Sequence, residues 1–424
     1  MAPGRPVTHN GLMAAITVDT STTPAPGDRE AALVVDAVAE LLGRHDPSST
    51  PAQELRGYQF DHGLAWVHFE RGHGGLGVRP QLQRVVDERL AAAGALPAAP
   101  ASFFLHLAGP TIATHGTDEQ KRRFLRPMFT GEELWCQLFS EPGAGSDFAG
   151  LATRAVADGD EWVVNGQKVW NTIAHLADWG MLVTRSDPNT PKHKGMTYFA
   201  LDMHSQGVEV RPLRQITGEA EFNEVYLTDV KVPDTDRIGA VGEGWRVSLT
   251  TLMNERTVIG GGGAPRRGSG PIAALVGVWH QLAAQERSAA RRDELTKLWI
   301  RAETLRLTNL RASANRRAGN PGPEGSVAKL ASAELNKAIL EQAVTFRGAA
   351  GMVGYDYTFR RPVEQLSATG TETGIGHAFL RTRANSIEGG TSEIMRNILG
   401  EQVLGLPGEP RIDKDARWID VPRN

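Results

Sequence analysis

The spacing of apolar residues changes twice along this chain of 424 residues, and the two changes divide it into three parts. From Arg29 apolar residues recur every three or four positions, as on an amphipathic helix. Near Trp135 the pattern becomes that of short strands, and from Gly244 to about Gly405 the helical spacing returns. The expected fold class is α+β: a helical N-terminal domain, a central antiparallel β-barrel or sandwich domain, and a C-terminal four-helix bundle.

The predicted boundaries follow these changes of spacing and of composition. They are a tail over 1–28, an N-terminal helical domain over 29–132, a β-domain over 133–243, a C-terminal helical domain over 244–405 and a second tail over 406–424. Thr117 is predicted to cap a helix that begins at Asp118. Within 161–170 the pair Asn165-Gly166 predicts the turn of a β-hairpin. Further strands are predicted over 179–184, 196–202, 207–211 and 223–232.

Composition excludes several classes of protein. The net charge of -3 gives no sign of a nucleic-acid partner. The single cysteine, Cys136, excludes an internal disulfide, fits a reducing cytoplasm and is interpreted as a small buried apolar residue rather than a nucleophile. No apolar run approaches the roughly 20 residues that span a bilayer, and the N-terminus lacks the apolar core of a signal peptide. A cytoplasmic protein without a membrane partner is expected.

One segment has a composition that suits ligand binding. An apolar run from Trp135 ends abruptly at Ser140, and residues 140–147 read Ser-Glu-Pro-Gly-Ala-Gly-Ser-Asp. Glycines allow the main chain to approach a ligand closely, and free amides with two serine hydroxyls suit a polar, anionic or heteroaromatic ligand. Taken alone, the segment is equally compatible with an ordinary tight loop after a strand.

Four segments, in this order, resemble the acyl-CoA dehydrogenase family in its bacterial form. They are Phe139–Asp147, Lys168–Thr172, Phe222–Pro233 with the following Gly242–Trp245, and Ile387–Ile394. The resemblance spans about Arg29 to Leu404. It implies an FAD-dependent oxidoreductase that desaturates an acyl-CoA thioester in lipid metabolism, such as fatty acid β-oxidation. It also implies an electron-transferring flavoprotein as electron acceptor, and it implies no metal.

The resemblance assigns roles to individual residues. Leu138, Phe139 and Ser140 would contact the pyrimidine edge of the flavin. Trp170 would pack on the ring, and Thr172 would hydrogen-bond near N5; the plain alternatives are a core aromatic and an exposed strand threonine. The full implied cofactor set is Leu138, Phe139, Ser140, Gly145, Ser146, Trp170, Thr172, Arg266, Thr391 and Glu393. The implied substrate-binding residues are Ser146, Arg256 and Gly389.

The base that removes the α-proton has two candidates. Many family members carry a glutamate directly before a C-terminal Gly-Thr-Ser, but Gly389 stands at that position here and Glu388 is one residue early. Members similar to the isovaleryl- and long-chain types carry the base in a Glu-Arg pair on a helix, which Glu255-Arg256 matches. We therefore predict that Glu255 abstracts the α-proton while flavin N5 receives the β-hydride. Glu388 remains the alternative, and a helix-surface role is the plain reading of Glu255.

Two motifs that reach the flavin across a subunit interface in the family are altered. Arg266 fits the first, but Ser269 replaces its aromatic residue, and Thr345 replaces the glutamine that opens the second. Homotetramer, homodimer and hetero-oligomer with a second dehydrogenase subunit therefore stay open. Two alternatives to the dehydrogenase are a non-catalytic or half-site partner subunit and a flavin oxidase or monooxygenase on the same fold.

Overall fold

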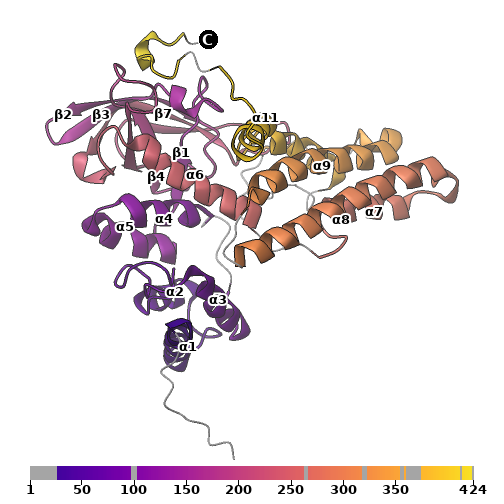
Figure 1. Ribbon diagram of the computed structural model, residues 1–424, viewed down its shortest axis with the longest axis horizontal. Helices are drawn as coiled ribbons and strands as arrows, with labels where there is room; N and C mark the ends of the chain where they lie inside the picture. Colours follow the sequence, from indigo (N-terminus) through magenta and orange to yellow (C-terminus); the bar gives the residue numbers. More distant parts are fainter. Residues whose placement is uncertain are drawn as a thin grey trace, which may run out of the picture.

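The computed structural model describes residues 26–96, 103–261, 266–317, 322–353, 358–359, 374–410 and 413–422. These residues form the three expected parts, with N-terminal helices, a β-domain and long C-terminal helices arranged around a junction that helix α6 crosses (Figure 1). The α+β architecture predicted from the apolar spacing is confirmed. Almost all of the predicted N-terminal tail lies outside the described residues.

The described residues of the N-terminal part form five α-helices. They are α1 (Pro26–Arg44), α2 (Ala52–Asp61), α3 (Gln83–Ala92), α4 (Leu105–His115) and α5 (Asp118–Thr130). The predicted cap of α5 is present, because the Thr117 hydroxyl accepts from Gln120 N and the Gln120 side chain accepts from Thr117 N. The helix ends at Gly131, whose φ of 79° suits glycine. The capped α5 packs on α2 and α4.

The β-domain is one eight-stranded sheet with the path β6-β7-β3-β2-β4-β5-β8, and β1 pairs with β4 outside that path. Its strands are β1 (Trp135–Leu138), β2 (Arg154–Asp158), β3 (Glu161–Val169), β4 (Trp179–Arg185), β5 (Met196–Asp202), β6 (Val208–Pro212), β7 (Asn223–Pro233) and β8 (Arg237–Ile238). The pairs β1–β4 and β2–β4 are parallel, whereas the other strand pairs are antiparallel. Alternate residues of β4 enter different cores: Val183 packs with the N-terminal helices, and Leu182 packs within the β-domain.

The predicted hairpin turn at Asn165-Gly166 is wrong. Strand β3 runs through this pair, and the ladder to β7 shifts register between Val164 and Gly166, which marks a bulge. Asn165 stabilises the bulge, because its Nδ2 donates to Asp229 Oδ1 at 3.0 Å and its Oδ1 accepts from Asp229 N at 2.9 Å. The turn lies earlier, between β2 and β3, where Gly159 has a φ of 66°. An Asp-Gly pair occurs there too, so the local signal could not decide between two sites.

The C-terminal part is built from long helices. Its α-helices are α6 (Gly244–Gly261), α7 (Pro271–Gln281), α8 (Ala289–Arg317), α9 (Glu324–Phe346), α10 (Ile375–Arg381) and α11 (Ser392–Asn397). Leu275, Ile339 and Phe346 are buried in their core. Helix α6 packs on α4, β5 and α9, so it touches all three parts of the chain. Within the described ranges, no helix is both long and apolar enough to cross a lipid bilayer.

Short helical turns complete the structure. The 3-10 turns are Pro80–Leu82, Phe148–Gly150, Asp234–Asp236, Ala284–Glu286, Gly348–Gly351, Thr382–Ser386 and Trp418–Asp420, and Ile398–Val403 forms a π-helical turn. Part of the C-terminal segment predicted as a tail contacts the β-domain, on which residues 413–422 lie (Figure 1). Trp418 is buried there, and a single anchoring aromatic in a Pro- and charge-rich segment gives no periodic signal.

Candidate active site

The segment 140–147, called the ligand loop below, leaves the end of β1 and is fixed at its base by a buried ion pair. The Glu141 carboxylate accepts from Lys168 Nζ at 2.7 Å and from the main-chain amides of Ala152 at 2.7 Å and Thr153 at 3.0 Å. Lys168 Nζ also donates to Phe139 O at 3.1 Å. These contacts hold the start of the loop against β3, and sequence reasoning missed them because the pairing joins residues 27 positions apart.

The tip of the ligand loop is open. Glu141 and Ala144 exchange two main-chain hydrogen bonds of 3.0 Å, which close a tight turn over the intervening residues. Gly145 and Ser146 are exposed, and a methyl group on Gly143 or Gly145 would meet no atom within 4 Å. The main chain of the tip is therefore accessible to a ligand, as the composition of the loop predicted.

The residues at the start of the loop face away from solvent. Leu138 is buried in the core of the β-domain, and Phe139 is buried on the opposite side, where it stacks on Phe148 with ring centroids 4.9 Å apart. Only their main-chain groups are thus available to a cofactor. Ser140 is half-buried, and its carbonyl accepts from Val169 N at 2.9 Å, which joins the loop to the end of β3.

Trp170 is held in a conformation that tryptophan rarely adopts. Its φ is 63°, in the left-handed region, and its side chain is 56% exposed. The residues before and after it are held by hydrogen bonds: Val169 N donates to Ser140 O, and Asn171 Nδ2 donates to Gln137 O at 2.8 Å. A strained backbone that displays a large apolar ring is typical of a ligand site. Trp170 is therefore not the core aromatic of the plain reading.

Asn171, which follows Trp170 in sequence, has a side-chain acceptor without a partner among the described residues. Its main chain exchanges two hydrogen bonds of 3.0 Å with Asn223, and its buried Oδ1 has no hydrogen-bond partner among the described residues. Thr172 follows and is half-buried rather than fully exposed on a strand. Asn171 was not predicted as a site residue, and its only sequence signal is its place between Trp170 and Thr172.

Glu255 lies on α6 and faces the strand that leads into the ligand loop. Gln137 Nε2 of β1 is 3.5 Å from Glu255 Oε2, at the outer limit of a hydrogen bond. Since Gln137 O also accepts from Asn171 Nδ2, one residue connects Glu255 with the segment that carries Trp170. Glu255 is half-buried. The side chain of Arg256 lies outside the described residues.

Glu388 is engaged in a different way. Arg381 Nη1 and Nη2 donate to its two oxygens at 3.2 and 3.0 Å, and Asn385 Nδ2 donates to Oε1 at 2.7 Å. The carboxylate is thus a fixed anchor for the following turn, in which Gly389 and Gly390 have φ of 62° and 92°. Such values favour glycine, which explains why no longer side chain stands there.

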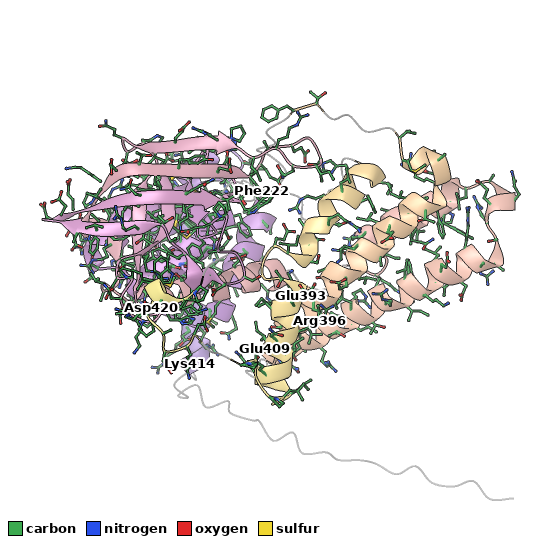
Figure 2. The ribbon with its side chains drawn as sticks, turned by 90° about the horizontal axis from the view of Figure 1, so that it is seen from above. Phe222, Glu393, Arg396, Glu409, Lys414 and Asp420 are labelled. Carbon is green, nitrogen blue, oxygen red and sulfur yellow. The ribbon has the colours of Figure 1, made fainter. Side chains whose placement is uncertain are left out.

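The other predicted cofactor residues lie on the C-terminal part. Thr391 caps α11, its hydroxyl accepting from Ile394 N at 3.1 Å. Glu393 is exposed and pairs with Arg396 at 3.2 Å on the same helix (Figure 2). Arg266 is exposed, in a turn whose Gly268 lies against Trp299 of α8. None of these contacts tests a role in cofactor binding.

The residues around Trp170 suit a flavin. An exposed indole offers a flat apolar wall, Ser140 is joined to the adjacent Val169 by a main-chain hydrogen bond, and the buried Asn171 Oδ1 has no donor among the described residues. The exposed amides of the ligand loop suit an anionic group such as a pyrophosphate. Cys136 is buried as predicted, and burial raises the pKa of its thiol, which disfavours a reactive thiolate.

Comparison with known proteins identifies the family of this chain. Three consecutive family models match: the N-terminal domain of acyl-CoA dehydrogenase over 31–132, the middle domain over 136–230 and the C-terminal domain over 242–404. The acyl-CoA dehydrogenase IpdE1 of Mycobacterium tuberculosis is 37% identical, over 82% of this chain and 86% of IpdE1. FadE34 of the same organism is 39% identical over 88% of this chain, and the match spans 48% of FadE34, about half its length.

Solved structures show the same fold. The ChsE4–ChsE5 complex from Mycobacterium tuberculosis superposes with a TM-score of 0.64 at 26% identity, covering 92% of this chain and 100% of the compared chain. A glutaryl-CoA dehydrogenase from Mycobacterium smegmatis in complex with FADH2 gives 0.62 at 20% identity, covering 90% and 96%. With its helical, β and helical parts each matched in order, the chain belongs to the acyl-CoA dehydrogenase family, whose members are FAD-dependent oxidoreductases that act on CH–CH groups.

Proposed function

We propose that this protein is an FAD-dependent acyl-CoA dehydrogenase in which Glu255 removes the α-proton of the acyl thioester. The contact between Gln137 and Glu255 carries the proposal, because it puts a half-buried carboxylate beside β1, which leads into the ligand loop. Glu388 is the less suitable carboxylate, since Arg381 and Asn385 already donate hydrogen bonds to its two oxygens.

The residues around the base have distinct tasks. The Gln137 amide holds one oxygen of Glu255, leaving the carboxylate oriented for proton removal. The Trp170 indole, with Ser140 and Thr172, would hold the flavin ring, and the tip of the ligand loop would hold pyrophosphate. FAD, when bound, supplies the acceptor for the β-hydride. In our proposal the Gly389 amide donates to the thioester oxygen, where negative charge develops as the α-proton leaves.

Anaerobic reduction by a panel of acyl-CoA thioesters tests this function. We expect at least one straight-chain, branched or steroid-side-chain thioester to bleach the flavin of the wild type, and Glu255→Gln to slow that reduction about 10²- to 10⁴-fold with its FAD content unchanged. Equal rates in the two proteins would exclude Glu255 as the base. If no thioester bleaches the flavin, the dehydrogenase proposal fails. Oxidation of the reduced enzyme by an electron-transferring flavoprotein would identify its electron acceptor.

A half-site subunit in a heteromeric dehydrogenase is the second candidate. Thr345, which replaces the family glutamine, directs its hydroxyl to Glu341 O of its own helix at 2.9 Å, so that hydroxyl proton is used internally. The solved ChsE4–ChsE5 structure is a complex of two named subunits, and FadE34 is about twice as long as the matched region. Native mass spectrometry of the protein, purified with its partners from the cells that produce it, would test the pairing with a second dehydrogenase subunit. A fully flavinated homotetramer or homodimer would exclude it.

A further inference from the structure

The C-terminal segment 413–422, called the strap below, is fastened to the connection between β4 and β5. Arg417 forms an antiparallel bridge with Pro191, Trp418 N donates to Thr190 O at 2.9 Å, and Ile419 N donates to Pro188 O at 3.0 Å. Figure 2 shows Lys414 and Asp420 on the β-domain side, whereas Glu409 lies near α11. The strap therefore returns from the helical domain to the β-domain.

Trp418 is the apolar anchor of the strap. It is 8% exposed, and the guanidinium carbon of Arg185 lies 4.9 Å from its ring centroid. Its Nε1 donates to Gly150 O at 3.3 Å. Gly150 ends the 3-10 turn Phe148–Gly150, which directly follows the ligand loop. Trp418 thus touches the turn in which the loop ends.

Arg185, which lies against the Trp418 ring, also contacts this turn. It is 2% exposed, and its Nη2 donates to Ala149 O at 2.6 Å in that turn. Its Nη1 donates to Lys192 O at 2.6 Å, so the guanidinium joins the turn after the loop to the β4–β5 connection. Covering this buried cation with the Trp418 ring excludes water from its hydrogen bonds to carbonyl groups.

Lys192 joins the strap to the loop itself. Its Nζ lies 3.0 Å from Asp147 Oδ1, at the end of the ligand loop, and 2.6 Å from Asp413 Oδ2, at the start of the strap. The Lys192 side chain is largely buried, while Asp147 is exposed. Burial lowers the pKa of Lys192, but the two aspartates outweigh it and the pKa is raised, so the shared cation stays charged.

We infer that the strap is a positioning element that holds the ligand loop in its binding conformation, through Asp413 on Lys192 and Trp418 on Arg185. Asp413 and Trp418 are positioning residues, because they act through Lys192 and Arg185 rather than on a ligand. The effect on ligands rests on the proposed function, in which this loop holds the pyrophosphate of FAD.

Amide hydrogen exchange of the full-length apoprotein, followed by mass spectrometry, tests the inference. We expect Asp413→Asn and Trp418→Ala to speed exchange about tenfold at the hydrogen-bonded amides of Ala144, Gly150 and Leu151, in the peptide that contains residues 144–151, with the rest of the sheet unchanged. The dissociation constant for FAD, measured by titration of the apoprotein, is expected to rise about tenfold. Asp420→Asn is the matched control, since Asp420 pairs with Arg417 inside the strap. Trp418→Phe retains a ring over Arg185 and is expected to stay within about threefold of the wild type.

Three results would overturn the inference that the strap positions the ligand loop. They are unchanged exchange of the loop in both Asp413→Asn and Trp418→Ala, faster exchange throughout the β-domain without a local excess, and a faster loop with an unchanged dissociation constant for FAD. The proposed function fails separately, if the wild-type apoprotein takes up no FAD. The exchange comparison alone then decides whether the strap holds the loop.

Discussion

Arg381 and Glu388 form a bidentate ion pair, with Nη1–Oε1 and Nη2–Oε2 distances of 3.2 and 3.0 Å. Arg381 Nε also lies 3.6 Å from the Glu221 carboxylate of the β-domain. Its guanidinium carbon is 5.9 Å from the ring of Phe222, which meets Trp170 edge-on at 5.7 Å. Phe222 lies where the sheet meets the C-terminal helices (Figure 2). One arginine therefore joins the turn after Glu388 to the wall of the candidate flavin site.

The pairing of Glu388 predicts a mild effect of neutralising it. Glu388→Gln keeps an oxygen that accepts from Arg381, so we expect flavin reduction by an acyl-CoA within about tenfold of the wild-type rate. Glu255→Gln, measured in the same stopped-flow experiment, is expected to be slower by about 10²-fold or more. A reversed order of the two variants would make Glu388 the base.

Arg381 is predicted to matter for stability. Arg381→Met leaves the buried Glu221 and the paired Glu388 without their cation, which we expect to cost about 3–5 kcal/mol in urea unfolding. Burial raises the pKa of Glu221 while Arg381 lowers it, so the carboxylate depends on this partner.

Two further variants make this stability measurement specific. Arg381→Lys keeps the charge without the bidentate geometry, so its free energy of unfolding should fall less than that of Arg381→Met. Arg396→Met removes an exposed pair with Glu393 and should change the free energy of unfolding by about 1 kcal/mol at most. Similar losses for Arg381→Met and Arg396→Met would contradict the role assigned to Arg381.

Trp170 allows strain and ligand contact to be separated. Trp170→Ala and Trp170→Gly both remove the indole and should weaken FAD binding to the apoprotein about tenfold or more. Glycine adopts a φ of 63° without strain, so the apoprotein of Trp170→Gly should be more stable than that of Trp170→Ala by about 1 kcal/mol. Titration with FAD and urea unfolding of the two apoproteins measure these effects. Unchanged FAD binding in both variants would remove Trp170 from the flavin site.

The sequence predicted those features that repeat or that punctuate the chain. The change from helical to strand spacing near Trp135 gave the three-part fold, and the side chain of Thr117 gave a helix cap that the structure confirms. Asn165-Gly166 was misread because a bulge and a hairpin turn both favour Asn-Gly, and only the pairing of β3 with β7 separates them. Local sequence does not carry that long-range information.

Some residues of the candidate site have a local sequence signal, and others do not. The ligand loop and the exposed Trp170 were indicated by composition and by family resemblance. Gln137, Lys168 and Arg381 were not, because each acts through a partner distant in sequence and none stands in a local motif. The catalytic and binding roles of all the predicted site residues, Arg256, Arg266 and Glu393 among them, stay predictions.

Glu141 gives a prediction about pH. Burial acts to raise the pKa of its carboxyl, but the Lys168 charge and hydrogen bonds from Lys168, Thr153 and Ala152 outweigh it, so the pKa is lowered. A carboxyl whose pKa is lower in the folded than in the unfolded state stabilises the fold above its unfolded value of about 4.3, and this stabilisation is lost as the pH falls through the folded value.

Glu141→Gln should therefore be destabilised most near pH 7. Its difference from the wild type in urea unfolding should shrink between about pH 5 and pH 3. Glu40→Gln, which alters an exposed pair with Arg44, should show almost no difference at either pH. A difference for Glu141→Gln that stays constant with pH would mean that the carboxylate charge does not hold the ligand loop, leaving only its shape and its hydrogen-bond acceptors to do so.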